Sequence, residues 1–233
     1  MSNNISKGNE ANAFGDNSIS IGDNSLAENI NNISIGHQAQ ATGDNSIYIG
    51  VMSNHSESQG NNSISIGDSI TSSNYAISIG YKSNSSSSNN SISIGDQSNS
   101  NGENSIAIGY KSYTENTNSI AIGDDSNCNS DNSIAMGYHV TIANDSSNSV
   151  CIGDGSTVNS SNSVSMGYST ICNGDNSVCI GDDSSVNVNK SIGIGHECTV
   201  NTNNNIILGN SVEKNCDIIY TGIINTKTPG FPS

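Results

Sequence analysis

The chain has 233 residues and a formal net charge of −15, with six Lys and no Arg, so its electrostatic field repels nucleic acids and anionic membranes. Hydrophobic residues make up only 32% of the chain and aromatic residues 4%, which excludes a thick globular core. No segment approaches the roughly 20 apolar residues of a membrane-spanning helix, and the first 15 residues lack the pattern of a secretory signal.

A six-residue frame, Asn-Ser-Ile-x-Ile-Gly or a close variant, recurs fourteen times. Nine of the thirteen intervals between its glycines are 14 residues long, and the others are 17, 13, 15 and 16. Such a short period is typical of a solenoid, with the irregular intervals absorbed in turns. We expect residues 1–14 to form an N-terminal cap or leader, residues 15–210 the solenoid, and residues 211–233 a C-terminal cap or transition segment. The frame glycines are expected at tight corners that require positive φ: Gly22, Gly36, Gly50, Gly67, Gly80, Gly95, Gly109, Gly123, Gly137, Gly153, Gly167, Gly181, Gly195 and Gly209.

The two residues that flank x are aliphatic in every copy, as in Ile19 and Ile21. Residues two apart share one face of a strand, and we expect this pair to point into the coil. A second strand is expected after each glycine, with small inward residues three and five positions later, such as Ala39 and Ala41. Coils stacked about 4.8 Å apart would make a rod of roughly 65 Å. The predicted fold class is all-β, a parallel solenoid of about fourteen 14-residue coils.

The residue x, expected to point away from the coil interior, is never charged and is small in twelve of the fourteen copies. Small residues on an outward row indicate close approach of another backbone, which predicts an interface with sister chains. Low-complexity drift is the alternative explanation. The predicted trimer face consists of Ser20, Ser34, Ser65, Ser78, Ser93, Ala107, Ala121, Ala135, Cys151, Ser165, Cys179 and Gly193.

From Asp68 onward, the residue after the corner glycine alternates between an acid and a ring, ending at Asp182 and His196. Stacked coils would place these side chains beside one another, so that a ring can hydrogen-bond the neighbouring carboxylate. A structural role is expected for this stripe, and ligand binding is the alternative.

The stretch Gly36-His-Gln-Ala-Gln-Ala-Thr-Gly43-Asp-Asn-Ser-Ile-Tyr-Ile-Gly50 resembles the head repeat of trimeric autotransporter adhesins, the YadA-like heads. The likeness extends over about residues 15–210. It implies a left-handed parallel β-roll, a homotrimer, and display at a surface for adhesion. Similar repeats occur in phage and large-DNA-virus fibre proteins, and residues 215–225 weakly resemble the transition into a following fibre module.

Six cysteines are present, and no two occupy the same position on adjacent coils, so we expect free, buried thiols. Free thiols favour assembly in a reducing compartment. The four His residues do not cluster in the sequence, and no catalytic, cofactor-binding or metal-binding residue is predicted. Calcium binding by the recurrent Gly-Asp turns is the open alternative to turn chemistry.

These features predict a non-enzymatic structural module, a rigid trimeric β-roll on a virion fibre or cell surface that serves attachment or spacing. The alternative is a bacterial-type adhesin head that binds a host matrix or cell ligand, a protein or a glycan, through the irregular turns at residues 51–60 and 141–149. Nucleic acid and a membrane span are not expected.

Overall fold

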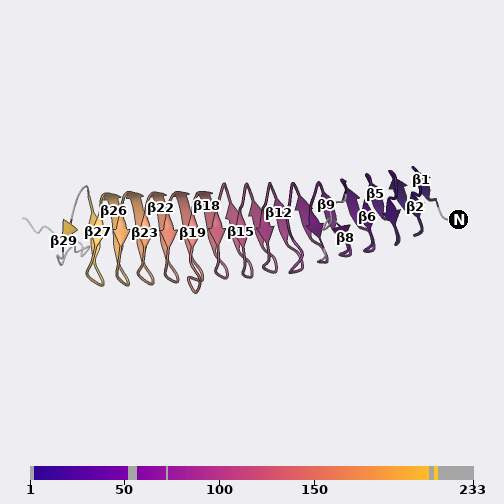
Figure 1. Ribbon diagram of the computed structural model, residues 1–233. Coiled ribbons are helices and arrows are strands. Elements are labelled where there is room, and N and C mark those ends of the chain that lie inside the picture. Colours follow the sequence, from indigo (N-terminus) through magenta and orange to yellow (C-terminus); the bar gives the residue numbers. More distant parts are fainter. Residues whose placement is uncertain (1–2, 52–56, 72, 210–212, 215–233) are drawn as a thin grey trace, which may run out of the picture.

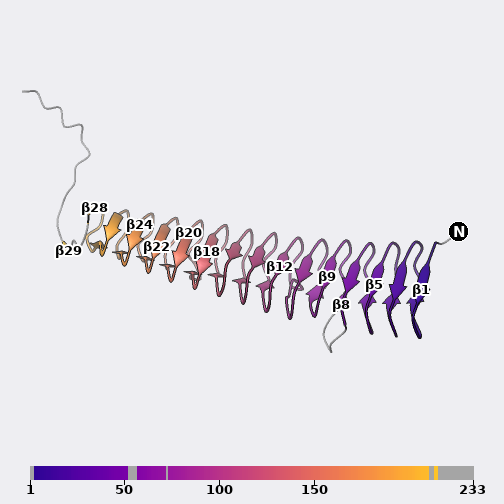
Figure 2. The ribbon, with the colours of Figure 1, turned by 90° about the horizontal axis from the view of Figure 1, so that it is seen from above.

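The computed structural model describes residues 3–51, 57–71, 73–209 and 213–214, with the backbone alone described at 57, 70, 213 and 214. Within these residues the chain forms one rod of stacked coils without any helix (Figure 1). Every strand pair is parallel, and each coil contributes a strand to one side of the rod and, in most coils, a shorter strand to the other (Figure 2). The predicted all-β parallel solenoid is confirmed.

The longer strands form one continuous sheet of fifteen, and all except the first, which reads Ile-Ser-Lys, carry the aliphatic–x–aliphatic triplet. From β18 to β26, the strands continue through the corner glycine to the residue after it. In order along the rod they are β1 (Ile5–Lys7), β3 (Ile19–Ile21), β5 (Ile33–Ile35), β7 (Ile47–Ile49), β9 (Ile64–Ile66), β11 (Ile77–Ile79), β12 (Ile92–Ile94), β14 (Ile106–Ile108), β16 (Ile120–Ile122), β18 (Ile134–Tyr138), β20 (Val150–Asp154), β22 (Val164–Tyr168), β24 (Val178–Asp182), β26 (Ile192–His196) and β28 (Ile206–Leu208).

The two-residue strands on the other side form a sheet of five and a sheet of nine. The first contains β2 (Asn12–Ala13), β4 (Leu26–Ala27), β6 (Gln40–Ala41), β8 (Glu57–Ser58) and β10 (Ile70–Thr71). The second contains β13 (Asn99–Ser100), β15 (Tyr113–Thr114), β17 (Asn127–Cys128), β19 (Thr141–Ile142), β21 (Thr157–Val158), β23 (Ile171–Cys172), β25 (Ser185–Val186), β27 (Thr199–Val200) and β29 (Glu213–Lys214). Between the two sheets, the coil at Asn84 makes only a single bridge, to Asn99.

The irregular intervals do not shift the strand register, as the sequence predicted. Across the 17-residue interval Ile47 still lies opposite Ile64, and across the 16-residue interval Ile134 lies opposite Val150. The additional residues are therefore accommodated in the turns. A one-residue slip in a strand would exchange its two faces, so this conservation of register keeps every inward row continuous.

Two corners of a typical coil require the left-handed backbone conformation, and this requirement explains part of the abundance of Asn. In the described part of the chain, 26 non-glycine residues have positive φ, among them 13 Asn and three Asp. Asn and Asp tolerate this region better than other L-residues because their short side chains can hydrogen-bond locally. One such corner lies two residues before the aliphatic triplet, as at Asn118, and the other lies two residues after the corner glycine, as at Asp125.

The coil stack begins earlier than the sequence analysis placed it. Strands β1 and β2, inside the segment expected as an N-terminal cap or leader, pair in register with β3 and β4. Residues 5–13 therefore add another coil to the rod. Apart from β29, the predicted C-terminal segment 211–233 lies outside the described residues.

Candidate functional site

The structure places the x row inside the coil, which contradicts the predicted trimer face. On each of these triplets the middle side chain is buried and its two aliphatic neighbours are at least partly exposed. The buried residues that were expected to face sister chains are Ser20, Ser34, Ser65, Ser78, Ser93, Ala107, Ala121, Ala135, Cys151, Ser165, Cys179 and Gly193. None of them can reach another chain without opening the coil.

The prediction failed because period 2 separates the two faces of a strand without saying which face is inside. The coil interior is thin, and x shares it with the residues three and five positions after the corner glycine. Those two positions are buried as predicted, for example at Ala39, Ala41, Val158 and Val200. This space accepts one side chain from the triplet, whereas the flanking pair of aliphatic side chains remains outside.

Side-chain volumes compensate across the interior. The one aromatic x residue, Tyr48, is buried against Ala39 and Ala41. At the opposite extreme x is Gly193, where an added Cβ would lie 2.9 Å from Val186 Cγ2 and 3.0 Å from Val200 Cγ2. Large partners are therefore matched by a glycine and small partners by a tyrosine, as close packing of the interior requires.

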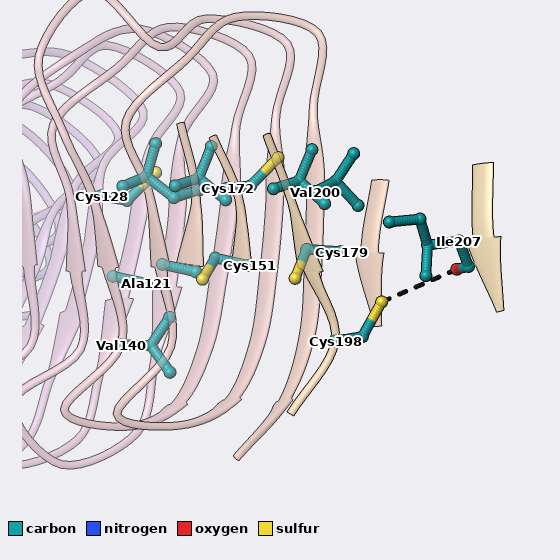
Figure 3. Packing of buried hydrophobic residues seen from close by; sticks show 13 residues of the cluster. Ala121, Cys128, Val140, Cys151, Cys172, Cys179, Cys198, Val200 and Ile207 are labelled. Carbon is teal, nitrogen blue, oxygen red and sulfur yellow. Dashed lines mark hydrogen bonds between the residues drawn. The ribbon is translucent and has the colours of Figure 1, made fainter. Parts of the chain in front are cut away.

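The chemistry of the interior changes along the rod. Toward the N-terminus, x is often a serine that hydrogen-bonds a hydroxyl across the coil, as in Ser20 Oγ to Ser25 Oγ at 2.7 Å and Ser93 Oγ to Ser98 Oγ at 2.8 Å. Toward the C-terminus the interior becomes an apolar cluster that extends from Ala121 to Ile207 (Figure 3). Hydroxyl pairs are thus more frequent at the x position in the N-terminal half of the rod, although Ser165 still pairs with Thr170 farther along, and apolar contacts predominate in the C-terminal half.

The aliphatic residues that flank x form two rows along the outside of the rod. Consecutive triplets pair Ile with Ile, for example Ile106 with Ile120 and Ile108 with Ile122. The more open members of the rows are between 36 and 58% exposed, among them Ile49, Met136 and Leu208. Two aliphatic rows of this length on a lone chain are an apolar surface of the kind that marks an interaction site.

The corner glycines have the backbone geometry that their positions require. Thirteen of the fourteen have φ between +99° and +150°, and Gly50 is the exception. A Cβ at Gly167 would lie 1.7 Å from the carbonyl oxygen of Gly181, and even at Gly50 it would lie 2.4 Å from that of Gly67. Neighbouring coils approach too closely at this edge for any side chain.

Five of the six cysteines lie within the described residues, and all five are buried and free, as predicted. Desolvation raises the pKa of Cys128 to about 11 and the pKa of Cys151 and Cys179 to about 12. Burial also raises the pKa of Cys172 and Cys198. These thiols are therefore protonated at neutral pH and behave as small apolar side chains. Cys198 Sγ lies 3.8 Å from the carbonyl oxygen of Ile207 (Figure 3).

The residues after the corner glycines form the predicted stripe, with carboxylates and rings in register. Tyr138 lies opposite Asp154, which lies opposite Tyr168 on its other side. The same ladder continues through Asp182 to His196. Each of these side chains is exposed. The stripe is thus a polar edge beside the aliphatic rows.

Cationic side chains lie against two of the stripe's rings. Lys82 and Lys111 each place Nζ 5.0 Å from the centroid of the preceding Tyr ring. A hydrogen bond with Tyr110 raises the pKa of Lys111. These are cation–π contacts at solvent-exposed sites.

One corner of the stripe gathers three side chains that can each offer a metal ligand. Atoms of Asp182, Asp183 and His196 lie within 4.8 Å of one another. His196 Nε2 is 3.5 Å from Asp182 Oδ2, which confirms the predicted contact between a ring and the acid beside it. The sequence analysis considered the His residues and the Gly-Asp turns separately and so missed this group. Its signal was an Asp-Asp pair followed fourteen residues later by His at the same corner.

Four stretches of the chain, residues 8–25, 27–50, 86–112 and 115–139, match the family of YadA head domain repeats. The resemblance stated from the sequence is thereby confirmed. No curated protein matches the chain. A search of the described residues finds no helix of the length and apolarity that a membrane crossing needs.

Proposed function

Because the repeats match the YadA head, we propose that this chain is a non-enzymatic structural module, a rigid homotrimeric β-roll that serves attachment or spacing on a virion fibre or cell surface. The observation that carries the proposal is the pair of aliphatic rows along the outside of the rod. They replace the x row as the proposed contact between sister chains.

Burial supports this assignment of the interface. Each of the fourteen frame coils presents two aliphatic side chains on the outside, and in all of them both are at least partly exposed on the isolated chain. Covering apolar surface gains about 25 cal/mol per Å², and the gain is repeated at every coil. Because the triplets remain in register over the irregular intervals, a second copy can contact the rows along the whole rod. The number of copies, three, comes from the likeness to YadA heads.

The interface is tested by adding charge to one row. Ile120→Asp places a carboxylate on the outer row without entering the coil, so we expect the coil to remain folded and the trimer to dissociate. Gln97→Asp adds the same charge at an exposed corner, where Asp125 and Asp183 already occupy the equivalent position. Native mass spectrometry should show monomers for the first variant and trimers for the second. Trimers for both would remove the aliphatic rows as the interface.

A direct adhesive role is the second candidate, and the longer turn after β19 favours it. This interval has 16 residues, and Asn144, Asp145 and Asn148 in it are exposed. Part of the other irregular turn, residues 52–56, lies outside the described residues. If the turn contacts a host ligand, replacing residues 143–148 by four residues should abolish binding to cells or matrix while far-ultraviolet circular dichroism remains unchanged. Unchanged binding favours the rod as a spacer.

A further inference from the structure

The corner between β24 and β26 combines the residue types and spacing of a metal site. Asp182 ends β24, His196 ends β26, and the two residues are paired in the ladder. Asp183 follows with φ of 48°, a left-handed corner that turns its side chain to the same edge. All three side chains are exposed, so small rotamer changes can bring their ligand atoms together.

Glu197 adds an independent feature that is typical of metal-binding histidines. Its Oε2 lies 4.0 Å from His196 Nδ1, while the other ring nitrogen, Nε2, faces Asp182. A histidine that binds a metal through one nitrogen usually directs the other toward a carboxylate, which fixes the ring orientation and increases its basicity. The third carboxylate also adds negative charge beside the site.

Other corners of the same rod serve as internal comparisons. At the corner of Asp124 and Asp125 the imidazole is His139, one position later in its coil, and its Nε2 lies 3.3 Å from Asp125 Oδ2. Two coils before the His196 corner, Asp154 is followed by a glycine and the next coil presents Tyr168. Within the described part of the chain, only the group at residues 182, 183 and 196 brings three potential ligands within 4.8 Å.

We propose that Asp182, Asp183 and His196 bind one divalent transition-metal ion per chain, with Zn²⁺ as the preferred ion and water completing its coordination. One imidazole nitrogen with two carboxylate oxygens suits Zn²⁺, whereas Ca²⁺ and Mg²⁺ prefer oxygen ligands alone. The site lies within a single chain and does not depend on the proposed trimer. Its position on the edge of the coil would allow the ion to join two adjacent coils.

The test is to measure the zinc affinity by isothermal titration calorimetry, with ZnCl₂ titrated into the full, reduced chain. His196→Tyr is the main variant, because Tyr138 and Tyr168 occupy the same position in other coils. We expect it to weaken zinc binding by more than roughly 100-fold, and Glu197→Gln to weaken it by roughly 10-fold, as loss of an outer carboxylate does elsewhere. Gln97 shows that Gln fits the left-handed corner. His139→Ala is the matched control and should leave the affinity unchanged.

Thiols are the competing ligands, and Co²⁺ distinguishes them. Cobalt bound to imidazole and carboxylate gives weak visible bands, whereas cobalt bound to thiolate adds an intense charge-transfer band. The proposal predicts weak bands that His196→Tyr removes. A thiolate band, the absence of saturable zinc binding, or equal affinity in the wild type and His196→Tyr would overturn it.

Discussion

Replacing a corner glycine by alanine should separate two neighbouring coils. At Gly167, φ is +138° and a Cβ would lie 1.7 Å from the carbonyl oxygen of Gly181, so either the residue or the next coil has to move. Strained backbone of this kind costs about 1–3 kcal/mol. Each ladder hydrogen bond weakened by the separation costs about 0.5–1.5 kcal/mol more. We expect Gly167→Ala to lower the free energy of unfolding by roughly 3–5 kcal/mol.

Gly155 provides the matched control, because it also has positive φ but has open space around it. Its φ is +63°, and the nearest atom to an added Cβ is Ser169 Oγ at 3.8 Å. Gly155→Ala therefore incurs only the left-handed backbone cost, about 1–2 kcal/mol. Urea denaturation followed by far-ultraviolet circular dichroism, at equal protein concentrations, gives both values. Equal losses for the two variants would refute the argument from close approach of the coils.

The remaining predictions concern the interior and the corners. Ser34 Oγ is buried without a hydrogen-bond partner, so Ser34→Ala should raise the free energy of unfolding by about 1 kcal/mol. Ser20→Ala removes a hydroxyl pair and should lower the free energy of unfolding by about 1 kcal/mol. Urea denaturation measures both changes. Burial raises the pKa of Cys151 and Cys179 to about 12 from an ordinary 9.0. The unfolded chain therefore loses these protons at a lower pH than the folded chain does. The contribution of the two thiols to stability is complete below pH 9 and should decline as the pH rises toward 12. Replacing both cysteines by Ala should flatten that decline in pH-dependent thermal melts, and an unchanged slope would contradict it. Lys190 has φ of 55°, so Lys190→Asn should raise the free energy of unfolding by about 0.5–1 kcal/mol and, with it, the melting temperature. Lys190→Gln, which removes the same charge, should leave the melting temperature unchanged.

The sequence predicted the features that depend on periodicity. The strand triplets, the positions of the second strand, the register across irregular intervals and the free buried cysteines all follow from a repeat in which equivalent residues stack. The stripe from Tyr138 to His196 was predicted on the same grounds, because residues after equivalent corners have to lie side by side.

The sequence analysis did not predict which face of the triplet is inside. It placed the two aliphatic side chains of each triplet in the interior, opposite two small residues, but the thin coil accommodates only the single x side chain. The information was present in pairs of positions: Tyr48 occurs where the opposite residues are Ala39 and Ala41, and Gly193 occurs beside Val186 and Val200. Such compensation is expected only among residues that share an interior.

The group at residues 182, 183 and 196 was missed for a different reason. Its members are fourteen residues apart and of two types, so no local motif marks them. They come together only when adjacent coils are stacked in register and the left-handed corner turns Asp183 toward the ladder. A search by repeat position would have found them.

The central claim is that the outer aliphatic rows are covered by two further copies of the chain. Light scattering on a sizing column under reducing conditions measures this directly, because three chains of 24.0 kDa give a particle of about 72 kDa. We predict that mass for the wild type and about 24 kDa for Ile120→Asp with its circular dichroism retained. A wild-type chain that remains folded at 24.0 kDa would leave the solenoid intact but would contradict the proposed trimer and its interface.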